Sequence, residues 1–201
     1  MENKDYLNQL NDIQHLMNRS TRFLSLSGLS GILAGLYATI GSFIIYWNRN
    51  TFKLPLKVFS PSFNFILSIA ISILVLSLIT GIVLSKQKAK KTGEKIWNPI
   101  AKQFLINFSI PLLTGGALAI IMIERSYFDL VSPITLLFYG LALINASRYT
   151  LETLRSLGIL FLIFGLLNAM YPGYGLYLWT LGFGFAHIGY GSYMYFKYDR
   201  K

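Results

Sequence analysis

His187 is the residue whose type and position most suggest chemistry, because it is the only histidine within the long apolar segments of the chain. A histidine in lipid must face other helices and find a partner, so an ionisable group there is a candidate functional residue. Two interpretations are open: a neutral histidine that holds helices together, or a group that binds a ligand or handles protons. His15 lies outside these segments, the chain has no cysteine, and the apolar segments hold no acidic cluster. We therefore predict no metal site and no cofactor.

Several other polar side chains in these segments could line a path for a small, weakly polar solute together with His187. Coupled transporters, however, usually keep charged groups within their spans or break helices near mid-depth. Apart from Pro111, neither feature is present. A transporter or channel is therefore the second hypothesis, with these further residues along its path: Asn107, Asn145, Asn168 and Thr180.

One short motif suggests an enzyme. Residues 28–31 read GLSG, which resembles the local nucleophile motif of rhomboid intramembrane proteases, and Ser30 with His187 could form a nucleophile and base pair. The motif stands at the start of the first apolar segment, whereas in those proteases it lies in a later helix. An intramembrane serine hydrolase is therefore the third hypothesis, and we expect no enzyme and no catalytic residue.

Three charged residues lie at three- and four-residue spacing between the fourth and fifth apolar segments: Arg148, Glu152 and Arg155. On a helical connection they would form a charge ladder that holds the loop. The alternative is a site for an anionic ligand or a lipid headgroup.

The elements that position these residues are six stretches without Asp, Glu, Lys or Arg. Only 13% of the chain is charged, against about 25% in soluble domains. About 20 helical residues cross the hydrocarbon core, where every backbone polar group needs a partner within the protein. We therefore predict an all-α, polytopic transmembrane bundle of six helices: 23–47, 63–85, 103–123, 130–147, 156–171 and 174–196.

Small residues recur at helical spacing on the first and last of these segments. Apolar side chains gain little by leaving lipid for one another, so close backbone approach through small residues drives much of the packing. The sequence predicts a tightly packed bundle or a homo-oligomer face at five positions: Gly31, Gly35, Gly182, Ala186 and Gly189.

The basic residues indicate how the chain lies in the membrane. Three fall before the first segment, six between the second and third, two between the fourth and fifth, and three after the last, which leaves four for the other side. The positive-inside rule then places both termini in the cytoplasm. We predict a bacterial inner-membrane protein with anionic lipid headgroups at its cytoplasmic face and no nucleic-acid partner. Its parts are an amphipathic cytoplasmic segment (1–22), a transmembrane domain (23–196) and a tail (197–201).

Two stretches, RSTRFLSLSGLSGILAG (19–35) and YPGYGLYLWTLGFGFAHIGYG (171–191), resemble a family of Bacteroidota inner-membrane proteins. That resemblance implies six helices and a membrane location and brings no activity. The hairpin LGILFLIFGLLNAMYPGYGLYLWTLGFGF is also loosely similar to HdeD-type acid-resistance membrane proteins. The first hypothesis is therefore a non-enzymatic accessory, sensor or stress-related protein that packs as an oligomer or with a partner.

Overall fold

The structure is a computed structural model that describes residues 26–52, 57–93 and 97–200. These residues are almost entirely helical, and none of them lies in a strand. This confirms the all-α prediction. The predicted amphipathic segment at 1–22 lies outside the described residues.

Five helices are long and apolar enough to cross a membrane. Each overlaps a predicted segment, but the second to fifth begin earlier than their apolar runs and the second ends later. The second and third begin with prolines, and the preceding Ser60 and Asn98 accept hydrogen bonds from the first helical turn. The helices are α2 (Gly28–Trp47), α3 (Pro61–Thr92), α4 (Pro99–Glu124), α5 (Phe128–Ala146) and α6 (Thr153–Met170).

The predicted sixth segment is helical from Gly175 onward, but its winding changes three times. After a turn at Gly173, whose φ is 97°, the chain runs through two α-helical and two π-helical stretches. The wider π turns are rare, and they are frequent at functional sites. The stretches are α7 (Gly175–Trp179), η3 (Thr180–Ala186, π), α8 (His187–Met194) and η4 (Tyr195–Asp199, π).

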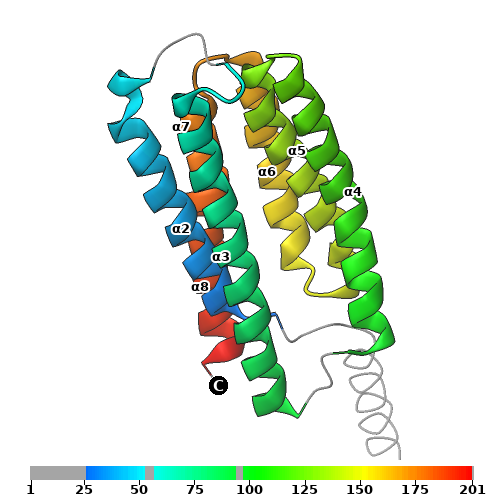
Figure 1. The fold of residues 1–201 in the computed structure, drawn as a ribbon. Helices are drawn as coiled ribbons and strands as arrows, with labels where there is room; N and C mark the ends of the chain where they lie inside the picture. The colour runs from blue at the N-terminus through cyan, green and yellow to red at the C-terminus, as the bar shows by residue number, and fades with distance from the viewer. Residues whose placement is uncertain (1–25, 53–56, 94–96, 201) are drawn as a thin grey trace, which may run out of the picture.

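The helices pack in two groups. Helix α5 lies between α4 and α6 (Figure 1), and helix α2 packs against both α3 and α8. The η3 stretch contacts both α2 and α6, so the last part of the chain joins the groups. A short 3₁₀ turn, η2 (Ser147–Tyr149), connects α5 to the start of α6.

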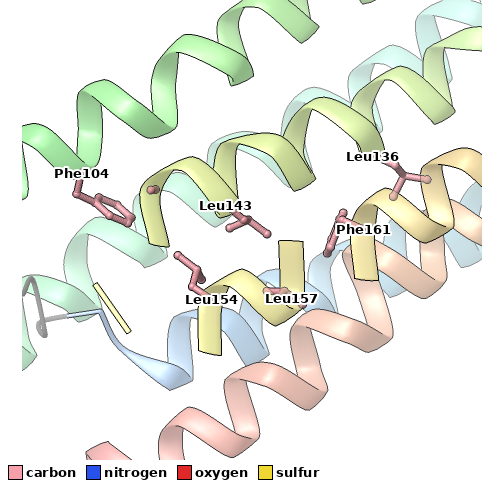
Figure 2. Close-up of a cluster of buried hydrophobic side chains, with 7 residues drawn as sticks. Phe104, Leu136, Leu143, Leu154, Leu157 and Phe161 are labelled. Carbon is pink, nitrogen blue, oxygen red and sulfur yellow. The ribbon is translucent and has the colours of Figure 1, made fainter. Parts of the chain in front are cut away.

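The buried core lies mainly between α4, α5 and α6 (Figure 2). Its members are Phe104, Leu136, Leu143, Ala146, Leu154, Leu157 and Phe161. Helix α3, in contrast, contributes little to the core, since no residue of its most apolar 18-residue window is buried. The outward surface of this helix therefore has the composition of a lipid-facing surface.

Candidate functional site

His187 pairs with a tyrosine that the sequence analysis did not select. Its Nε2 lies 2.8 Å from the hydroxyl of Tyr139 on α5, and its Nδ1 lies 3.3 Å from the carbonyl oxygen of Gly182. A carbonyl can only accept, so Nδ1 carries the hydrogen. In the neutral ring Nε2 then accepts the hydrogen of the Tyr139 hydroxyl. Both nitrogens of the histidine are engaged.

Aromatic rings surround this pair. The ring centroids of Phe161 and Phe183 lie 5.3 and 6.0 Å from that of His187, and the Phe183 ring is nearly parallel to the imidazole. His187 is 8% exposed. The imidazole therefore sits in close-packed, apolar surroundings, where an unmade hydrogen bond would be costly.

The π-helical stretch positions the acceptor of this site. Gly182 precedes His187 by five residues, which is the spacing that a π turn brings together. A Cβ at Gly182 would lie 2.7 Å from Leu136 Cδ2 and 3.3 Å from Phe161 Cε1. Glycine at this position thus lets η3 approach α5 and α6 closely, which places the imidazole beside Tyr139.

Of the other polar residues proposed for a solute path, Asn107 and Asn145 are joined by a hydrogen bond, whereas no hydrogen bond links either of them to Asn168, Thr180 or His187. Asn168 donates to Ser132 Oγ (2.7 Å) and to the carbonyl of Gly175 (3.3 Å). The remaining three each donate to a backbone carbonyl: Asn145 to Asn107 (2.8 Å), Asn107 to Gln103 (2.8 Å), and Thr180 to Leu176 (2.7 Å). Asn145 and Asn168 lie near the ends of successive helices that run in opposite directions, so they lie toward opposite ends of the bundle.

Ser30 has its own partner as well. Its hydroxyl donates to the carbonyl of Ser27 at 2.6 Å, within the first turn of α2. With both His187 nitrogens bonded elsewhere, the nucleophile and base pair required for a serine hydrolase is not formed.

Asp199 forms a second polar cluster that the sequence analysis missed. Its Oδ1 lies 2.7 Å from the Lys88 ammonium, and its Oδ2 accepts from the backbone N–H of Gly28 (2.7 Å) and the hydroxyl of Ser27 (3.3 Å). Lys88 also donates to the carbonyl of Leu26 at 2.8 Å. The carboxylate therefore accepts a hydrogen bond from a free N–H at the start of α2, and it links this helix end to α3 and η4. From the sequence, Lys88 counted only as one of the charges that orient the chain.

The predicted small packing residues fall into different surroundings. Added Cβ atoms at Gly31 and Gly35 would lie 3.2 Å from Gly191 Cα and 2.6 Å from the Gly184 carbonyl, both in the last part of the same chain. Gly182 packs on α5 and α6, as described above. Ala186 lies against the buried core, whereas Gly189 has open space above it. Gly31 and Gly35 thus serve contacts within the chain.

Arg148, Glu152 and Arg155 lie on one surface at the α5–α6 connection. They line a shallow depression of about 630 Å³ together with neighbouring hydroxyl groups. Within the part of the chain that the structure describes, no ion pair joins Glu152 to either arginine. The same part of the chain contains no group of three residues able to hold a metal ion.

Comparison of the chain with protein-family models, curated proteins and solved structures found no match.

We expect Tyr139→Phe to destabilise the fold by about 1–3 kcal/mol, because it leaves His187 Nε2 buried without a partner. The thermal midpoint of the purified chain in detergent should fall by several degrees. Tyr177→Phe makes the same chemical change on a side chain that is 52% exposed, and should leave the midpoint unchanged. Equal midpoints for the two variants would show that the Tyr139–His187 bond adds nothing to stability.

Proposed function

We propose that this protein is a non-enzymatic, multi-pass protein of a bacterial inner membrane, with six spanning segments and both termini in the cytoplasm. It acts as an accessory, sensor or stress-related component, and it assembles with further copies or with a partner protein. The observation that carries the proposal is the outward apolar surface of α3, where the 18-residue window has a mean hydropathy of 2.7 and none of it is buried. Such a surface is stable in lipid and costly in water.

The arrangement of the polar groups supports a structural rather than a catalytic role. His187, Asn168 and Ser30 each form a hydrogen bond with another residue, and none of these bonds joins two of the three. The close packing around His187 also weighs against the second hypothesis, a solute path, since such a path needs room and water beside its polar groups.

Helix surfaces that pack against nothing within the chain support assembly with another copy or a partner. Helix α3 packs mainly against α2, and Gly116 and Gly189 on α4 and α8 have open space where a side chain would stand. Small residues on exposed helix faces allow close approach of another helix in lipid.

Topology can be tested directly because the chain contains no cysteine. We expect Asn50→Cys to react with a membrane-impermeant maleimide in intact spheroplasts, since it lies in the connection predicted to face outward. Lys90→Cys, near the end of α3, should react only after the membrane is permeabilised. Both positions are exposed, so a lack of labelling cannot arise from burial within the described fold.

The cysteine-free chain is the control for background labelling. Labelling of both positions in intact spheroplasts, or of Lys90→Cys alone, would contradict the proposed orientation. Recovery of the chain as a monodisperse soluble protein without detergent or lipid would contradict membrane insertion itself.

A further inference from the structure

The depression at the α5–α6 connection is lined by two arginines and one glutamate, Arg148, Arg155 and Glu152, so its net charge is positive. Its lining includes two exposed arginines, Arg148 and Arg155, and neither is ion-paired with an acidic side chain among the described residues. Ser156, on the same wall, has a hydroxyl that makes no hydrogen bond within the described chain. Guanidinium groups bind phosphate oxygens through two parallel hydrogen bonds, which makes two exposed arginines at one depression suited to a phosphate group.

An apolar stripe leads away from this depression along α6. Ile159 lines the depression and is itself 45% exposed. The exposed side chains Ile163 (49%), Leu166 (58%) and Met170 (67%) follow it at steps of four, three and four residues, which places them on one face of the helix. From Ile159 to Met170 the helix rises about 17 Å at 1.5 Å per residue. That length matches one leaflet, since half of the hydrocarbon core is about 15 Å.

We propose that this surface binds one anionic phospholipid molecule. The phosphate lies between Arg148 and Arg155, and an acyl chain follows the stripe from Ile159 to Met170. The inference rests on the proposed membrane placement, which puts the depression at the cytoplasmic headgroup layer and the stripe in the hydrocarbon. A soluble phosphate compound would use the arginines but would leave the stripe uncovered, which is why we assign a lipid.

Native mass spectrometry of the full chain in detergent tests this site. The chain is titrated with dioleoylphosphatidylglycerol, with dioleoylphosphatidylcholine, and with inorganic phosphate as a competitor. We expect the first phosphatidylglycerol to bind at least tenfold more weakly to the double variant Arg148→Gln, Arg155→Gln. The matched control is Lys90→Gln, Lys91→Gln, which removes two exposed positive charges at the end of α3 and should change binding less than twofold.

Three results would overturn the proposal. Equal weakening by both double variants would show general attraction to positive charge instead of a site. Equally tight binding of phosphatidylcholine would remove the requirement for an anionic lipid. Full displacement of phosphatidylglycerol by millimolar inorganic phosphate would assign the arginines to a soluble phosphate. Each can occur while maleimide labelling supports the membrane orientation, so failure of this site is distinguishable from failure of the proposed function.

Discussion

Gly35→Ala is expected to lower the thermal midpoint of the purified chain by about 3–10 °C, although alanine favours helices more than glycine does. Gly35 is buried on α2, and an added Cβ would lie 2.6 Å from both the Gly184 carbonyl oxygen and Ile188 Cγ1. The carbonyl cannot rotate away without disturbing η3. Helix α2 must therefore move away from α8 and η3, at a cost of about 1–3 kcal/mol, which for a chain of this size is a shift of several degrees.

Gly189→Ala is the matched control for this prediction. Gly189 lies in α8, where an added Cβ would have no neighbour within 4 Å. We expect its variant to keep the midpoint or to raise it slightly, through the better helix propensity of alanine. Equal midpoints for the two variants would mean that α2 and α8 are not in backbone contact.

A larger substitution at the same position, Gly35→Leu, separates two roles for the glycine stripe of α2. In the structure, Gly28 and Gly31 approach the last part of the same chain, as Gly35 does. If the stripe instead joined two copies, Gly35→Leu would lower the oligomeric mass in detergent and leave monomer stability intact. We expect Gly35→Leu to destabilise the single chain, so that a smaller fraction of the protein stays monodisperse after heating.

The helical class could be predicted from the sequence because it depends on the length and composition of single apolar runs. A run of about 20 uncharged apolar residues can satisfy its backbone in lipid only as a helix or a closed barrel, and these runs lack the alternation of barrel strands. The exact ends were not predicted from the apolar runs. Ser60 and Asn98, which cap α3 and α4, lie outside those runs, and α3 continues through a lysine-rich stretch to Thr92.

The partners at the polar sites depend on tertiary structure. His187 could be selected from its type alone, but Tyr139, on a helix 48 residues earlier, was one phenol among thirteen tyrosines. Asp199 lies 171 residues from the Gly28 N–H that it accepts from. Spacing along one chain does not encode such pairs. The π turns were not predicted, because the propensities of single residues do not distinguish a π turn from an α turn.

Asp199→Asn is expected to lower the free energy of unfolding by about 2–4 kcal/mol, because it leaves the charged Lys88 without its counter-ion. The side chains of Lys88 and Asp199 are only 15% and 10% exposed, and breaking a buried ion pair by removing one partner costs several kcal/mol. An asparagine oxygen can still accept from the Gly28 N–H, so the loss reports mainly on the charge. Unfolding in detergent, followed by the near-ultraviolet signal of the aromatic side chains, measures it.

Glu124→Gln is the control, since it removes one negative charge from an exposed position at the end of α4. Adding Lys88→Met to Asp199→Asn should recover most of the lost stability, because methionine leaves no buried charge to satisfy. Hydrogen exchange at the first turn of α2 should rise in Asp199→Asn and fall again in the double variant, if the carboxylate acts through Lys88. If the double variant is no more stable than Asp199→Asn, the lost stability comes from the missing negative charge at the N-terminus of α2, and the ion pair with Lys88 contributes little.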